Sequence, residues 1–178
     1  MFKPLSRCTW SYAYVEIIKI GFFKEVKKET SDVGIIDSTS EHLKKNSSVT
    51  DNETKSLLSK IAFLVNPSVF TLYDTLAKAS LWKIMRGSNE LKRKDLESYA
   101  VFHEHILKLV VQLKKQKKLD HAKNILRDFK GTVAHNYFTK NPEAYELRVV
   151  DKLLWIKGQK KDARKINNEQ YSKLLKLA

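Results

Sequence analysis

The chain is poor in the residues that build disulfide frameworks, zinc sites and tightly turned sheets. Its 178 residues include one cysteine, Cys8, together with three prolines and five glycines. A single thiol excludes an internal disulfide framework and a zinc site built from several cysteines. This usage is typical of a reducing compartment, so we expect a cytoplasmic protein. So few prolines and glycines also argue against a sandwich with many tight turns.

Acidic residues are scarce relative to basic ones. The 34 lysines and arginines outnumber the 20 aspartates and glutamates, so the formal net charge is +14 and the pI is about 9.7. Such an excess attracts a polyanion, which can be nucleic acid, an anionic membrane surface or an acidic protein. Charged residues interrupt the apolar N-terminal stretch MFKPLSRCTWSYAYVEIIKIGFF. We therefore predict neither a signal peptide nor a membrane span there.

Apolar residues and helix formers are plentiful. Apolar types make up 42% of the chain, and long runs rich in Lys, Leu and Glu favour helices. We predict an all-α fold, a single compact helical domain of about six or seven helices. Residues 1–49 are expected to form an N-terminal segment with a polar loop, and residues 50–178 the helical core domain. Residues 9–28 are rich in aromatic and β-branched types, which suit a helix or a strand, and the helical spacing of Val15, Ile18 and Phe22 favours the helix. Residues 29–50 are polar and predict a loop with one short helix near EHLKK.

A helix start is well marked at Thr50. Thr50 and Glu53 match a capping box, and an apolar stripe follows, comprising Leu57, Leu58, Ile61, Ala62, Leu64 and Val65. Asn66-Pro67 ends this helix, because the residue before a proline avoids the α region. The next residues, SVFTLY, favour an extended path. A second helix is predicted from Asp74 or Thr75 to about Arg86, with Gly87 as its stop.

Further helices are predicted toward the C-terminus. The longest runs from Asp95 to about Lys117, and another spans about 119–129. Pro142 opens the next at an allowed first-turn position, and that helix closes at Gly158. A last helix is expected near 169–177.

Lys55 and Asp74 enclose the most informative stretch, TKSLLSKIAFLVNPSVFTLYDT. From Lys55 to Val65 a helix climbs roughly 15 Å. The connector from Asn66 to Tyr73, fully extended, covers roughly 26 Å. The connector can therefore run back along the helix and return Asp74 to the level of Lys55. The spacing permits the two side chains to meet, without requiring it.

This stretch resembles part of a known protein family. Lys55, the apolar helix, the extended return and Asp74 opening a new helix resemble the centre of the helix-hairpin-helix DNA glycosylases of the 8-oxoguanine type. SKIAFLVNPSVFTLYDTLA is similar to uncharacterised bacterial relatives of that type, which often show a pattern like SK.L.FL.P..FPIYDS. AYELRVVDKLLWIKG looks similar to their closing helix. The resemblance covers about residues 50–86 and 142–158.

The resemblance implies a base-excision DNA glycosylase/lyase that acts on an oxidised purine. Lys55 would be the nucleophile that attacks the sugar C1′, which requires a lowered lysine pKa. Asp74 would stabilise the cationic sugar as the base departs. Lys60 is the fallback nucleophile, although helical spacing turns it away from Lys55. Asp74 can equally serve as a plain helix N-cap, and both roles are compatible.

The hairpin departs from the family pattern, and this leaves a second function open. The family's turn is usually glycine-rich, so that its backbone N–H groups hold a DNA phosphate, but SSVTDNET contains no glycine. Asp51 and Glu53 also place negative charge where that phosphate would lie. The alternative is a non-catalytic basic helical module that binds nucleic acid or an acidic protein partner.

Basic clusters are the candidate DNA-binding residues, namely Lys92, Arg93, Lys94, Lys157, Lys160 and Lys161. Solvated helix ends explain such runs equally well. His103 and His105, two apart on a helix, point to different sides, so we expect no metal site. No phosphate-cradling glycine loop is present, and no cofactor is expected.

Overall fold

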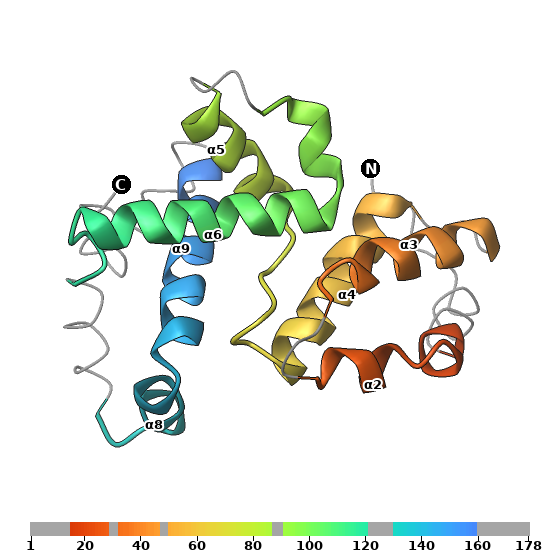
Figure 1. The fold of residues 1–178 in the computed structure, drawn as a ribbon, viewed down its shortest axis with the longest axis horizontal. Coiled ribbons are helices and arrows are strands. Elements are labelled where there is room, and N and C mark those ends of the chain that lie inside the picture. The colour runs from red at the N-terminus through yellow and green to blue at the C-terminus, as the bar shows by residue number, and fades with distance from the viewer. Residues whose placement is uncertain (1–14, 29–31, 47–49, 87–90, 121–129, 160–178) are drawn as a thin grey trace.

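The computed structural model describes residues 15–28, 32–46, 50–86, 91–120 and 130–159. Within these ranges the chain forms helices and loops, with no strand (Figure 1), so the predicted all-α class is confirmed there. The helices are α2 (Phe22–Val26), α3 (Ile35–Asn46), α4 (Asp51–Val65), α5 (Thr75–Met85), the 3-10 helix η1 (Arg93–Glu97), α6 (Tyr99–Lys115), α8 (Val133–Lys140) and α9 (Pro142–Gly158). Residues 15–19 are helical as well.

Helices α2, α3 and α4 pack together on one side of the molecule (Figure 1). The prediction of a polar loop with one short helix over residues 29–50 is wrong, because α3 is a helix of twelve residues. Its inner face carries Ile36 and Leu43, but also Thr39 and Ser40, all at most 2% exposed. Two small polar residues on the buried face weaken the apolar period, and this is why the sequence pattern indicated a loop.

Helix α4 begins and ends where the sequence predicts. The Thr50 hydroxyl accepts a hydrogen bond from the Glu53 N–H at 3.4 Å and donates one of 2.7 Å to the Glu53 carboxylate. Asn66 follows the last turn, and its side-chain amide donates to the carbonyls of Val26 and Lys28. These bonds tie the end of α4 to α2, so the connector to α5 starts from a fixed point.

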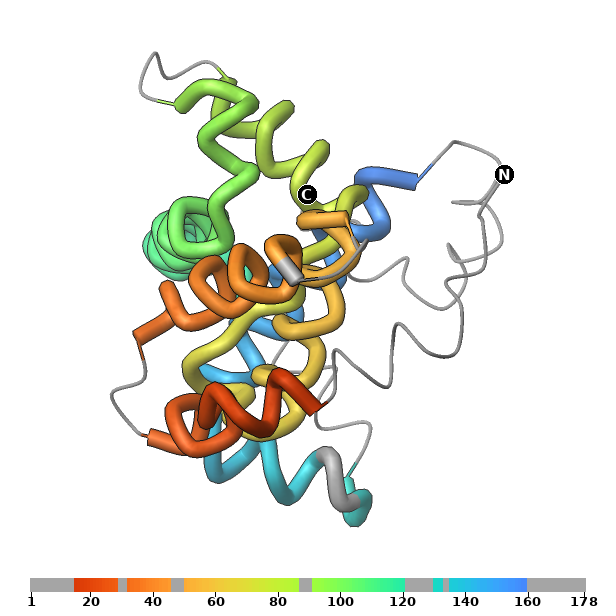
Figure 2. The backbone as a smooth tube through the Cα atoms, turned by 90° about the vertical axis from the view of Figure 1, so that its right-hand side faces the viewer, coloured from red at the N-terminus to blue at the C-terminus, as the bar shows by residue number. Residues whose placement is uncertain are grey.

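The connector leads to α5, which packs extensively against α9. Gly158 makes this contact possible, because a Cβ there would lie 2.5 Å from the Leu76 carbonyl oxygen. Helix α6 crosses α9 and also contacts α5, and Figure 2 shows α6 end-on. One apolar core joins these helices to the N-terminal ones, with Phe22, Tyr73 and Phe102 among its large side chains.

Several local predictions are wrong. Leu64, predicted to belong to the buried stripe of α4, is 81% exposed. Val15 and Ile18, whose spacing favoured a helix, do lie in a helical turn, but they are 46% and 52% exposed and the buried residue there is Ile17. The continuous helix predicted over 95–117 is split at Ser98, whose hydroxyl accepts from the Val101 N–H and caps α6.

Helix α8 was not predicted from the sequence. Thr132 caps it by accepting from the His135 N–H, and the Phe138 ring lies 5.4 Å from that of Tyr145 on α9. The predicted stop at Gly87 and the predicted helices at 119–129 (beyond Asp120) and 169–177 lie outside the described residues. None of the helices that the structure describes is both long and apolar enough to cross a bilayer.

Candidate active site

Lys55 lies in a closed ionic cluster near the start of α4, where it is 6% exposed. Its Nζ is 3.0 Å from Asp37 Oδ1 and 2.9 Å from Asp51 Oδ2, and it donates to the Glu97 carbonyl at 2.6 Å. Burial alone would lower the pKa of Lys55, but the hydrogen bonds to Asp51 and Asp37 outweigh it and raise that pKa above its ordinary value. Asp74 is not among these partners, so the structure does not bring the expected pair together.

Asp37 links this cluster to α6. Its carboxylate accepts hydrogen bonds from the Tyr99 N–H at 2.8 Å, the Ala100 N–H at 3.0 Å and the Ser98 hydroxyl at 2.8 Å. Burial by itself would raise the pKa of Asp37, but the bonds from Ala100 and Tyr99, with that from Lys55, hold it below its usual range. Lys55 and Asp37 therefore join α3, α4 and α6 as a structural unit.

Asp74 occupies the N-cap of α5, as the sequence predicts. Its Oδ1 accepts from the Leu76 N–H at 2.8 Å and from the Ala77 N–H at 3.3 Å. The same residue lines an open hollow of about 220 Å³. The other residues that line this hollow are Lys60, Leu72, Arg148, Asp151, Lys152 and Trp155. The carboxylate of Asp74 therefore both caps α5 and lines a potential site.

Lys60, the fallback nucleophile, is the residue of α4 that reaches this hollow. It follows Lys55 by five residues, which at 3.6 residues per turn turns it by roughly 140° around the helix. Its side chain is exposed, and within the described residues it has no ion pair or hydrogen bond. It also lines a second hollow of about 340 Å³, beside Asn52 and Thr75. Lys60 therefore stands between two adjoining depressions.

Asp151 is the titratable residue that sequence reasoning missed. It is 5% exposed, and its Oδ2 receives a hydrogen bond of 2.6 Å from Arg148 Nη1. Burial raises the pKa of Asp151 to about 6, helped by the charge of Asp74 and opposed by that of Arg148. The signal was present in the sequence, because Asp151 follows Leu147 by four residues and precedes Leu154 by three. It is an acid on the apolar face of its helix.

Aromatic rings and cations complete the rim of the hollow. Trp155 is partly exposed, and Lys152 Nζ lies 3.8 Å from the centre of its ring. The Arg148 guanidinium lies 5.5 Å from the ring of Phe63. A flat aromatic surface beside several cations is suited to a planar, electron-rich group carried on an anionic backbone.

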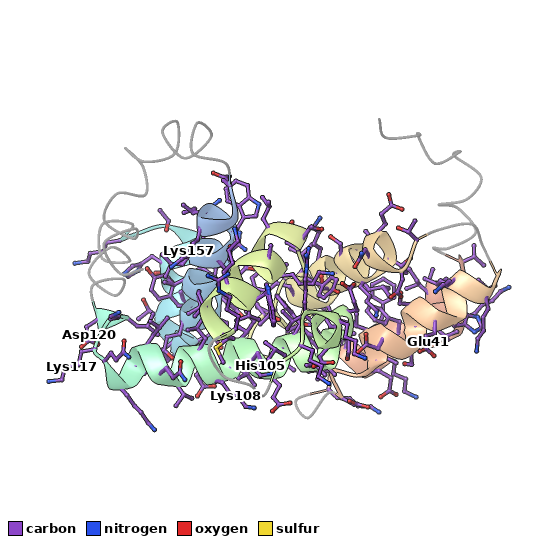
Figure 3. The ribbon with its side chains drawn as sticks, turned by 90° about the horizontal axis from the view of Figure 1, so that it is seen from above. Glu41, His105, Lys108, Lys117, Asp120 and Lys157 are labelled. Atoms are coloured by element: carbon purple, nitrogen blue, oxygen red, sulfur yellow. The ribbon has the colours of Figure 1, made fainter. Side chains whose placement is uncertain are left out.

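The predicted DNA-binding cations fall into separate places. Lys92, Arg93 and Lys94 are exposed at the start of η1. Lys157, labelled in Figure 3, lines a different, mainly apolar hollow between α5, α6 and α9. Lys160 and Lys161 lie outside the described residues.

No group of three or more His, Cys, Asp or Glu side chains is arranged to hold a metal ion in the part of the chain that the structure describes. Comparison with protein-family models, with curated proteins and with solved structures finds no match to this chain.

Proposed function

We propose that the protein binds DNA and acts as a base-excision DNA glycosylase/lyase on an oxidised purine, with its chemistry in the hollow at Asp74. One observation carries this proposal. The aspartate that caps α5 shares a hollow with an exposed amine, Lys60, a second and buried carboxyl, Asp151, and an aromatic face, Trp155. These are the group types needed to expel a base from a sugar.

Lys60, rather than Lys55, supplies the amine. Only an unprotonated amine has the lone pair that attacks C1′. Two carboxylates hold Lys55 in its protonated form and raise its pKa, which is the opposite of what a nucleophile requires. Lys60 is exposed at the hollow and bears no such pair among the described residues.

Asp74 stabilises the positive charge that develops on the sugar. Its Oδ1 is engaged by two backbone N–H groups at the start of α5, which fixes the carboxylate in place. Because the carboxylate does not reorganise as the charge appears, its electrostatic effect is available throughout bond cleavage. Trp155 offers an aromatic surface on which an extruded base can stack, and Lys152, beside that ring, adds positive charge that attracts the DNA backbone.

Borohydride trapping tests the proposal. The protein is incubated with duplex DNA that contains 8-oxoguanine or an abasic site, and sodium borohydride is added to reduce any imine. We expect a covalent protein–DNA adduct that is absent in Lys60→Gln and retained in Lys83→Gln, an exposed lysine on α5. An adduct that persists in Lys60→Gln, or an unmodified protein that never forms one, contradicts this assignment.

A second candidate function is a non-catalytic basic module that binds nucleic acid or an acidic protein. The observation that favours it is the first turn of α4, where Asp51 and Glu53 replace the glycine-rich phosphate cradle of the resembled family. Salt-sensitive DNA binding without an adduct would identify such a nucleic-acid module. Absence of DNA binding would point to the acidic protein partner.

A further inference from the structure

Asp151 lines the same hollow as Lys60 and Asp74, where it can contact the base that is expelled. It comes from α9, whereas Lys60 comes from α4 and Asp74 from the start of α5, so three separate elements converge on one hollow. Its carboxyl is buried, and Oδ2 is held by Arg148 Nη1 at 2.6 Å. Oδ1 has no hydrogen-bond partner within the described residues. One oxygen is thus anchored while the other is left without a bond.

We propose that Asp151 is the general acid that protonates the departing base. This inference rests on the function proposed above and names a further residue for the same site. If Asp151 served only in the ion pair with Arg148, it would not need to contact the substrate. As a general acid it must contact the substrate in the hollow that it lines.

The proton and electron balance closes on these residues. The Lys60 amine donates its lone pair to C1′, the glycosidic C1′–N9 bond breaks, and its electron pair passes to the base. Asp151 transfers its proton to the base and becomes a carboxylate. The ammonium now formed between Lys60 and C1′ then returns a proton to Asp151. The acid is regenerated, and the sum is exchange of the base for the amine at C1′.

The charges around Asp151 support a protonated form at mildly acidic pH. The groups that face it are Asp74 at the N-cap of α5, Lys60 on α4, and Arg148 and Lys152 on its own helix. Burial and the negative charge of Asp74 favour the neutral acid, and Arg148 opposes them. A pKa of about 6 is suited to a general acid, which must carry its proton near neutral pH.

Two substrates separate this role from a structural one. An abasic site has no base to expel, so its imine with Lys60 forms without the acid, whereas 8-oxoguanine must be protonated as it leaves. We expect Asp151→Asn to slow excision of 8-oxoguanine by about 100-fold or more and to change borohydride trapping on abasic DNA by less than about 3-fold. Glu104→Gln, an exposed acid on α6, is the matched control and should affect neither.

The pH profile provides a second readout. In the unmodified protein the ratio of excision to abasic-site trapping should fall about tenfold per pH unit above pH 6, since the ratio cancels titration of the amine. Arg148→Met removes the cation that opposes protonation and should move this fall to higher pH. Equal losses on both substrates in Asp151→Asn, or no loss on either, overturn the role of Asp151 and leave the glycosylase proposal standing. If the unmodified protein forms no adduct on either substrate, both proposals fail.

Discussion

Lys55 and Lys60 are chemically identical residues five positions apart, and their surroundings separate their roles. Lys55 is enclosed between Asp37 and Asp51, so its charge is balanced and its ammonium is fixed. Lys60 is exposed on another face of α4, at the hollow that contains Asp74. A buried, paired ammonium stabilises structure, whereas an open one is free to react or to bind an anion.

His103 is a buried residue whose titration makes the stability of the protein depend on pH. It is 6% exposed, its ring stacks on Tyr99, and its Nδ1 lies 3.2 Å from the Thr71 hydroxyl. Burial lowers the pKa of His103 to about 4. Because the folded protein binds this proton less readily than the unfolded chain, stability is present above the unfolded pKa and is lost as pH falls toward 4.

We expect His103 to reduce the free energy of unfolding by about 2 kcal/mol between pH 7 and pH 5. The raised pKa of Asp151 acts in the opposite direction, since that carboxyl is relieved when it is protonated below pH 6. Comparing the protein with His103→Asn cancels the Asp151 contribution. Chemical denaturation at both pH values should show a weaker loss in the variant, and an equal loss would contradict the assignment.

At the scale of elements, the contact between α5 and α9 places the carboxyls of the hollow together. Asp74 stands at the start of α5 and Asp151 on α9, and the two helices approach closely at Gly158. Both acids line the same hollow, which lies where the start of α5 meets α9. We therefore expect the geometry of the site to be sensitive to the close packing at Gly158, a residue with no chemistry of its own.

Gly158→Ala tests this packing. The added Cβ would lie 2.5 Å from the Leu76 carbonyl oxygen and 2.8 Å from the Leu76 carbonyl carbon, so the two helices must separate. We expect the free energy of unfolding to fall by about 1–3 kcal/mol, measured by urea denaturation. Gly34→Ala is the matched control, because its Cβ would meet the side chain of Asp32 and the change should be under about 0.5 kcal/mol. Equal stability of the two variants would contradict the close approach.

At the scale of the whole molecule, the net charge of +14 sets the expected mode of binding. Cations that displace counterions from phosphates make affinity fall steeply with salt. Basic residues are spread over several elements. In Figure 3, Lys108 is labelled on α6 and Lys117 just after the end of that helix, while Lys157 is labelled on α9.

We expect the affinity for duplex DNA to fall about 100-fold or more between 50 and 200 mM salt, as about four or more phosphate contacts would require. Replacing Lys92, Arg93 and Lys94 together by glutamine should lower the slope of log K against log salt by about 2–3 if all three contact phosphates. Fluorescence anisotropy with a labelled duplex measures both quantities. An unchanged slope would remove these three residues from the proposed DNA-binding surface.

The amino-acid sequence by itself determined the helical class in the described residues and the ends of α4, α5 and α9. Caps and breakers act locally, so Thr50, Asp74, Asn66-Pro67 and Pro142 have the expected effects. Helix α3 was underestimated because its buried face includes small polar residues, and α8 was not predicted.

The neighbours of each charged residue were decided only by the tertiary structure. Asp37 and Glu97 are distant from Lys55 in the chain, and Asp151 is distant from Asp74, so no local spacing could pair them. Partner choice follows from how α3, α6 and α9 pack around α4 and α5. Burial and Coulomb effects depend on that packing, and they make Lys55 a buried, paired lysine and Lys60 an exposed one.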